Sequence, residues 1–257
     1  MITIGNYIKA ESLQQAWELN QKKSSRVLGG MLWLKQSRNR VGTVIDLSGL
    51  ELDTIEETDS EFSIGAMVTL RQLEQHEGLN AFTGGAVEEA VKSIVGVQFR
   101  NLATVGGSIW GRFGFSDVLS VFLALDSSVE LYKGGMVPLA EFAAMGYDRD
   151  ILVRLVVKKT PVKCLYQSVR ITKTDFPVLT CAAAKTESGW RFVYGARPGR
   201  AIPLELPLGH SSEELSDMAA ETIPVGSNMR GSAEYRRQLV KTLTRRAAEK
   251  LGGEWEC

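Results

Sequence analysis

The most informative stretch of this sequence is Arg100-Asn101-Leu102-Ala103-Thr104-Val105-Gly106-Gly107-Ser108-Ile109. Its glycines predict that the segment 98–109 is a loop rather than a regular helix or strand. Glycine lets backbone N–H groups approach a ligand closely, which suits phosphate oxygens. A second pair, Gly29-Gly30, follows the short run Val27-Leu28. Each pair alone is typical of an ordinary turn. Neither forms the Gly-x-Gly-x-x-Gly of a Rossmann site or the Gly-Lys-Ser/Thr of a P-loop.

Strands and helices alternate on both sides of these loops. Three Ser or Thr residues, each followed three residues later by Gln or Glu, predict capped helices after Ser12, Thr69 and Ser211. Further helices are expected over 85–95, from Asp117 to 125, and over 232–251. Strands are expected at 43–47, 62–66, 129–131, 151–157, 165–171, 178–184 and 191–194. Because strands followed by helices dominate the last third, we expect an α+β part with an antiparallel sheet there.

The composition excludes several classes of protein. The 257 residues carry 30 Lys plus Arg and 30 Asp plus Glu, so no net field draws the whole molecule to nucleic acid. The most apolar segment, 118–125, is much too short to span a bilayer. The first residues lack the basic and apolar regions of a secretion signal. We therefore expect a cytoplasmic protein without a membrane span.

The cysteines and histidines predict no metal site. Cys164, Cys181 and Cys257 are too far apart in the sequence for a disulfide framework, a zinc site or an iron–sulfur centre. His76 and His210 are the only histidines, and a solvated position is the default for each. We expect neither a metal nor a catalytic side chain in this chain. The basic residues Arg236, Arg237 and Lys241 are expected on a solvated helix face, with Tyr235 and Leu239 turned to the core.

The glycine loop and its flanks resemble the flavin-binding subunit of the molybdenum hydroxylases. This family includes the medium subunits of carbon monoxide dehydrogenases and the FAD domain of xanthine dehydrogenase. Its usual pattern is a Thr/Ser-Ile/Val-Gly-Gly-Asn loop, then an acidic residue, then Leu-Leu-Ala-Leu-Asp at the end of the next helix. The corresponding residues here are Thr104 to Ser108, Asp117, and Leu123-Ala124-Leu125-Asp126.

The resemblance extends along essentially the whole chain. Val27-Leu28-Gly29-Gly30 lies where the family has Ala-Gly-Gly-Thr-Asp-Leu, and the segment 64–69 resembles its Ile-Gly-Ala-x-Thr. Near the C-terminus, the segment 230–237 resembles the Ala-Ser-Ala-Glu-Tyr-Arg opening of its last helix.

The resemblance implies an α+β fold in two domains. Residues 1–159 would form a two-part FAD-binding domain of the vanillyl-alcohol-oxidase type, with two α+β lobes. Residues 160–257 would form a smaller α+β domain of the carbon monoxide dehydrogenase flavoprotein type, with an antiparallel sheet. The cofactor would be FAD. Carried over by position, the residues that would bind it are Leu28, Gly29, Gly30, Ile94, Thr104, Val105, Gly106, Gly107, Ser108, Asp117 and Leu152.

The function implied is electron transfer within a larger oxidoreductase. The chain would take electrons from iron–sulfur clusters of a small 2Fe-2S subunit, itself served by a molybdopterin-binding large subunit, and pass them through FAD to an external acceptor. A homodimer formed through such a complex is also expected.

Three departures from the family pattern keep an alternative open. Met31-Leu32 replaces the Thr-Asp that follows the first diglycine, Ser108 replaces the commoner Asn, and Tyr166 stands where several relatives have Lys. A structural or assembly subunit with weak or lost FAD binding is therefore the second hypothesis. A stand-alone reductase of the enolpyruvyl-sugar type is a third, for which the sequence shows no convincing pairing of proton-donating and substrate-binding motifs.

Overall fold

The computed structural model describes residues 2–252, and its contacts divide the chain into two units. Unit 1 consists of Met1–Leu73, Val97–Gly111 and Ser127–Lys158. Unit 2 consists of Glu74–Gly96, Arg112–Asp126 and Lys159–Cys257. Each unit is thus assembled from stretches that are separate in the sequence. The division into domains at residues 159 and 160 stays a prediction.

Unit 1 begins with a small parallel sheet. Its elements are β1 (Thr3–Lys9), α1 (Leu13–Asn20), β2 (Ser25–Leu28), a short 3-10 helix (Leu34–Gln36) and β3 (Arg40–Asp46), and the strand order is β1-β3-β2. The predicted cap of α1 is confirmed, because the Ser12 Oγ accepts the Gln15 N–H at 3.1 Å. All three strands are parallel, so their carboxyl ends lie at the same end of the sheet. The first diglycine follows the carboxyl end of β2.

The second sheet of unit 1 is antiparallel. Its strands are β4 (Ile55–Glu57), β5 (Glu61–Gly65), β6 (Ser127–Leu131), β7 (Gly135–Pro138) and β8 (Leu152–Lys158), in the order β4-β5-β8-β6-β7. Helices α2 (Leu70–Gln75), α5 (Val97–Arg100), α6 (Val105–Trp110) and α8 (Leu139–Ala144) accompany it, α2 extending across the boundary between the units. Helix α6 packs on β8 and β5. The sheet therefore supports the segment that carries the second diglycine.

The expected loop at 98–109 is wrong, because the segment contains the two short helices α5 and α6. Thr104 caps α6 by accepting the Gly107 N–H on its Oγ1 at 3.1 Å. Position 106 needs glycine, because a Cβ there would lie only 2.7 Å from the Ala66 carbonyl oxygen. Packing against Ala66 thus outweighs the poor helix propensity of the two glycines.

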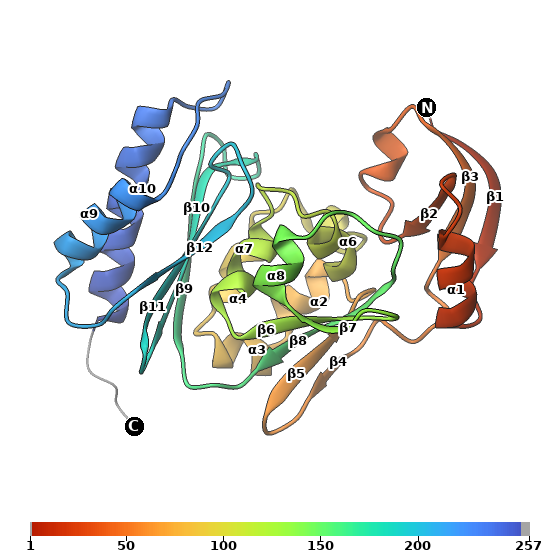
Figure 1. Cartoon of the computed structure of the whole chain (residues 1–257), viewed down its shortest axis with the longest axis horizontal. Helices are drawn as coiled ribbons and strands as arrows, with labels where there is room; N and C mark the ends of the chain where they lie inside the picture. Colours follow the sequence, from red (N-terminus) through yellow and green to blue (C-terminus); the bar gives the residue numbers. More distant parts are fainter. Residues whose placement is uncertain (1, 253–257) are drawn as a thin grey trace. The chain divides into compact units, whose positions relative to one another are not determined.

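Unit 2 is a four-stranded antiparallel sheet between helices (Figure 1). Its elements are α3 (Glu77–Phe82), α4 (Ala86–Lys92), α7 (Asp117–Ala124), β9 (Lys163–Arg170), β10 (Pro177–Thr186), β11 (Gly189–Gly195), β12 (Ile202–Leu206), α9 (Ser212–Thr222) and α10 (Ala233–Leu251). Helices α9 and α10 cover one face, while α4 and α7 pack on strands of the same sheet. Strand β10 is buried at nine of its ten positions, because helices lie against both of its faces.

The main features of the predicted α+β fold are confirmed. The sheet of unit 2 is antiparallel, and helices and strands are mixed throughout the described residues. No helix between residues 2 and 252 is both long and apolar enough to cross a membrane. Cys164 and Cys181 are buried free thiols, whereas Cys257 lies outside the described residues.

Candidate functional site

The two diglycine segments lie against each other in unit 1. A Cβ on Gly30 would stand 1.7 Å from the Leu102 carbonyl oxygen, and one on Gly29 would stand 2.5 Å from the Thr104 Oγ1. The Gly107 Cα lies 3.7 Å from the same position at Gly29. The structure therefore brings Gly29 and Gly30, which follow Leu28 at the end of β2, against residues 102–107. Glycine is required at position 30 by this close backbone approach.

Backbone donors of the second segment are used within the protein. The Val105 and Gly106 N–H groups donate to the Val68 and Ala66 carbonyl oxygens, each at 2.8 Å. The Gly107 N–H donates to the Thr104 side chain, and the Ser108 N–H donates to the Thr104 carbonyl oxygen at 3.1 Å. Val105 and Gly106 are also buried. The first turn of α6 therefore has its N–H groups satisfied without a ligand.

Gly107 is the exposed glycine of this pair. A Cβ placed on it would meet only the Thr104 Oγ1, at 3.2 Å, among the atoms of the described chain. Its backbone φ lies outside the left-handed region, as expected for a helical residue. Protein packing therefore does not require glycine at 107, and the side where its Cβ would lie is open. Ser108, the next residue, is partly exposed, and its Oγ donates to the Thr104 carbonyl oxygen at 2.9 Å.

The first segment carries the donors that the protein leaves available. Within residues 2–252, the N–H groups of Gly30, Met31 and Leu32 have no acceptor in the protein. Met31 has φ 62°, a left-handed conformation that is uncommon for residues other than glycine. Left-handed residues are a component of the backbone concavities that bind anions. In the sequence, Met31 and Leu32 stand out as a loss of polar side chains that leaves the backbone donors in place, but the sequence does not show which of these donors are unused.

The remaining predicted site residues are divided between the units. Leu152 is buried in β8 of unit 1, opposite Leu131 in the strand register. Ile94 and Asp117 belong to unit 2, where Ile94 follows α4 and Asp117 begins α7. Ile94 is partly exposed, whereas Asp117 is buried.

The Asp117 carboxylate is bound by two side chains of β9. Its Oδ1 accepts a hydrogen bond from the Tyr166 hydroxyl and pairs with the Arg170 guanidinium at 2.5 Å. Burial raises the pKa of the Asp117 carboxyl, while Arg170 and Tyr166 act in the opposite direction. Burial and the nearby carboxylate hold the pKa of Tyr166 well above its ordinary value, so its hydroxyl remains a donor. Arg170 was not among the residues singled out from the sequence.

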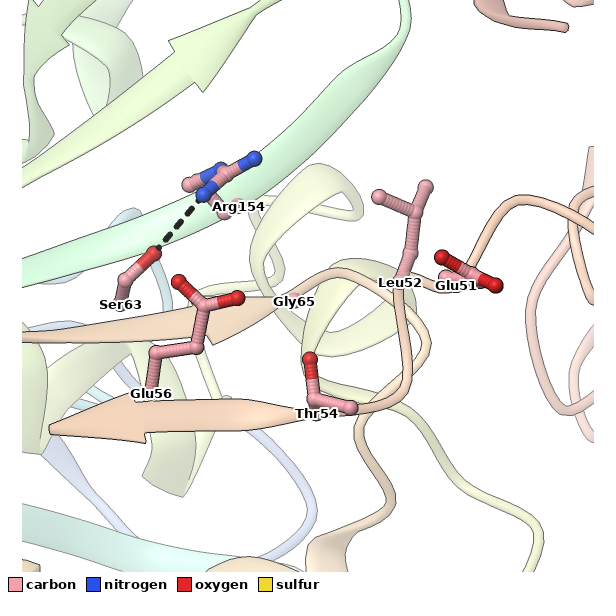
Figure 2. A pocket seen from close by; sticks show the side chains of 7 residues that line it. All are labelled: Glu51, Leu52, Thr54, Glu56, Ser63, Gly65 and Arg154. Carbon is pink, nitrogen blue, oxygen red and sulfur yellow. Dashed lines mark hydrogen bonds between the residues drawn. The ribbon is translucent and has the colours of Figure 1, made fainter.

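Unit 1 also contains a small polar hollow. None of the predicted site residues lines it. Its lining residues are Glu51, Leu52, Thr54, Glu56, Ser63, Gly65 and Arg154. Figure 2 shows the Arg154 side chain reaching toward Ser63, to which it donates a hydrogen bond of 3.2 Å. With a volume of about 30 Å³, it has room for little more than water. The described residues contain no cluster of side chains that could hold a metal ion.

Comparisons with known proteins identify the family of the chain. A family model described as the FAD binding domain in molybdopterin dehydrogenase matches residues 3–159. The chain is 26% identical over 247 residues to protein YgfM of Escherichia coli K12, with 93% of each covered. It is 26% identical over 275 residues to the glyceraldehyde dehydrogenase medium chain of Sulfolobus acidocaldarius, covering 96% of this chain and 98% of that one.

The fold also has a solved counterpart. A chain of the carbon monoxide dehydrogenase from Hydrogenophaga pseudoflava matches with a TM-score of 0.86. The alignment covers 96% of both chains at 22% identity, so this likeness concerns the fold.

Proposed function

Because the chain belongs to the family of FAD-binding domains of molybdopterin dehydrogenases, we propose that it is the FAD-binding electron-transfer subunit of a molybdenum hydroxylase-type oxidoreductase. When bound, FAD supplies the redox chemistry, and the protein supplies its position and surroundings. Electrons would arrive from a 2Fe-2S small subunit beside a molybdopterin-binding large subunit. The proposal includes a cytoplasmic location and a complex that contains two copies of this chain.

One observation carries this proposal: the open side of Gly107 lies in the same unit as the available amides of Gly30, Met31 and Leu32. FAD presents a pyrophosphate with two negative charges, and backbone N–H groups are good donors to such oxygens. The contact between Gly29 and Thr104 connects the two segments. The residues present therefore fit a pyrophosphate that takes its hydrogen bonds from the first segment and passes close to Gly107.

The other predicted contacts have distinct roles in this proposal. Gly29 and Gly30 permit the docking of the segments, Thr104 caps α6, and Val105 and Gly106 anchor its first turn to 66–68. Ser108 offers a hydroxyl beside the pyrophosphate. Apolar contacts to the flavin would come from Leu28, Ile94 and Leu152.

The finer division of the fold is part of the same proposal. Residues 1–159 would act as a two-part FAD-binding domain of the vanillyl-alcohol-oxidase type, and residues 160–257 as the C-terminal domain. The span of the family model, 3–159, supports this boundary.

A second function is an assembly or structural subunit with little affinity for FAD. The observation that favours it is the internal satisfaction of all four N–H groups from Val105 to Ser108. The buried Tyr166 adds to it, since no cation is supplied at that position. Under this alternative, the protein would copurify with molybdenum and iron–sulfur subunits and carry no flavin.

Titration of FAD into purified protein tests the proposal. Wild type should bind oxidised flavin, and Gly107→Val should bind at least ~10-fold more weakly, about 1.4 kcal/mol, because a side chain would occupy the open approach. Gly146→Val is the matched control, since a Cβ at this glycine of unit 1 meets nothing within 4 Å. No binding by wild type at high micromolar FAD would sink the proposal. Normal binding by Gly107→Val would show that the pyrophosphate lies elsewhere.

A further inference from the structure

The Asp117 carboxylate is almost fully buried, and its Oδ1 is already paired within unit 2. Its side chain is 7% exposed, and one oxygen already accepts from the Tyr166 hydroxyl and the Arg170 guanidinium. Both partners belong to β9 and lie four residues apart, so they project from the same face of that strand. A carboxylate with an adjacent guanidinium is electrically compensated within the protein.

Arg170 extends this contact to the loop between β9 and β10. Its second terminal nitrogen donates to the Asp175 carbonyl oxygen at 2.5 Å, and its Nε donates to the Ser168 Oγ at 3.2 Å. The Asp175 carboxylate in turn pairs with Arg230 at 3.0 Å. One guanidinium thus joins the first turn of α7 to the loop 171–176.

Aromatic side chains bring the same two segments together. Phe115, two residues before α7 begins, packs edge-on against Phe176 with ring centroids 4.8 Å apart. The Arg230 guanidinium lies over the Phe176 ring at 5.1 Å. The hydrogen bonds and the ring contacts therefore hold the start of α7 and the loop 171–176 in one arrangement.

We infer that Asp117 is a positioning residue, which ties the first turn of α7 to the loop 171–176 through Arg170, and that it does not bind the nucleotide part of FAD. The second half of this inference rests on the proposed function. Tyr166 completes the arrangement, because its hydroxyl satisfies the carboxylate without adding a second buried positive charge. The acidic residue of the glycine-loop pattern thus acts inside unit 2.

Three variants separate these roles. Asp117→Asn keeps the shape but leaves the Arg170 charge buried without its counter-charge, so the urea midpoint should fall. Asp117→Asn combined with Arg170→Met removes both charges and should recover most of that loss. Tyr166→Phe removes one hydrogen bond and should have the smallest effect. A double variant less stable than Asp117→Asn alone would overturn the coupling between the two charges.

Hydrogen exchange distinguishes positioning from general loss of stability. In Asp117→Asn, amides of the loop 171–176 and of the first turn of α7 should exchange at least ~10-fold faster under native conditions. Helix α10, in the same unit, should change much less. Equal acceleration across unit 2, or none, would overturn the positioning role.

FAD titration of the double variant tests the second half. Its affinity should stay within about threefold of wild type, because the carboxylate does not touch the nucleotide. A loss of tenfold or more, with native exchange rates retained in α10, would show that Asp117 binds FAD directly. If wild type itself does not bind FAD, the proposed function fails, while the urea and exchange measurements still decide the positioning role.

Discussion

Gly30→Ala should destabilise unit 1, even though it adds only one methyl group. The new Cβ would lie 1.7 Å from the Leu102 carbonyl oxygen, 2.5 Å from the carbon of that carbonyl and 3.0 Å from the Ala103 nitrogen. All three atoms are backbone, so no side chain can rotate away. The segments would have to separate by roughly 1.5 Å before ordinary contact is restored. Overpacking of this kind costs about 3 kcal/mol or more when the obstacle is rigid.

Gly107→Ala is the matched comparison, since its Cβ meets only the Thr104 Oγ1 at 3.2 Å. Replacing glycine by alanine inside a helix gains up to about 1 kcal/mol of helix propensity, which offsets this mild contact. Its free energy of unfolding should therefore equal that of wild type within about 1 kcal/mol. Urea unfolding followed by circular dichroism measures both variants against wild type.

The effect of FAD on stability should distinguish Gly107→Ala from wild type. Saturating FAD should raise the urea midpoint of wild type, because a ligand of the native state stabilises it. The shift should be smaller for Gly107→Ala, whose folded state is intact but whose open side is filled. Equal urea midpoints for Gly30→Ala and wild type would refute the close backbone contact between Gly30 and Leu102.

Two further predictions follow from groups in unit 2. Burial raises the pKa of Cys164 and of Cys181 to about 12. In a Cys257→Ser background, neither thiol should react with a thiol reagent near pH ~8 until the protein unfolds, and fast labelling of native protein would contradict their burial. The hydrogen bond from Arg230 lowers the pKa of Asp175, so its stabilising contribution is present above the ordinary carboxyl pKa and is lost as pH falls through the lowered value. Arg230→Gln should raise the pKa of Asp175, which NMR titration measures. An unchanged pKa would exclude the ion pair between Asp175 and Arg230.

Features that depend on neighbouring residues in the sequence were predictable. The caps at Ser12, Thr69 and Ser211 are confirmed, each with its Oγ accepting the N–H three residues later. The start of α10 after Ser232 is also as predicted. Caps are local hydrogen bonds, so their signal lies within four residues. The family resemblance is likewise confirmed by the family model. It was predictable because it rests on motifs that follow one another in order along the chain.

The solvated basic face predicted for the last helix is wrong at Arg236. This side chain is fully buried and Tyr235 is 47% exposed, both against expectation, whereas Leu239 is buried as predicted. The Arg236 guanidinium donates to the Val178, Gly226 and Gly231 carbonyl oxygens, which replace the water that it loses. Those acceptors lie on other segments, and helical periodicity carries no information about them.

The close approach of the two glycine segments was not predictable from the sequence, and their role in binding FAD stays a prediction. The contact of Gly30 with Leu102 joins positions that are far apart in the sequence, and it decides why glycine is needed there. The uses of the Val105 and Gly106 amides depend on residues 66–68 in the same way. Sequence patterns indicate which residues can approach a phosphate, whereas the fold decides which of their donors are already taken.

The interleaving of the two units has a consequence for how the protein is made. Unit 1 is complete once Lys158 has been synthesised, whereas α4 and α7 of unit 2 precede the sheet that covers them. Helix α7 is buried along its whole length and α4 at four positions in the finished fold. At about 5–20 residues per second, these apolar helices wait on the order of ten seconds for β9 to β12 to emerge from the ribosome. A nascent chain stalled in this interval would display them to chaperones, to proteases or to other nascent chains.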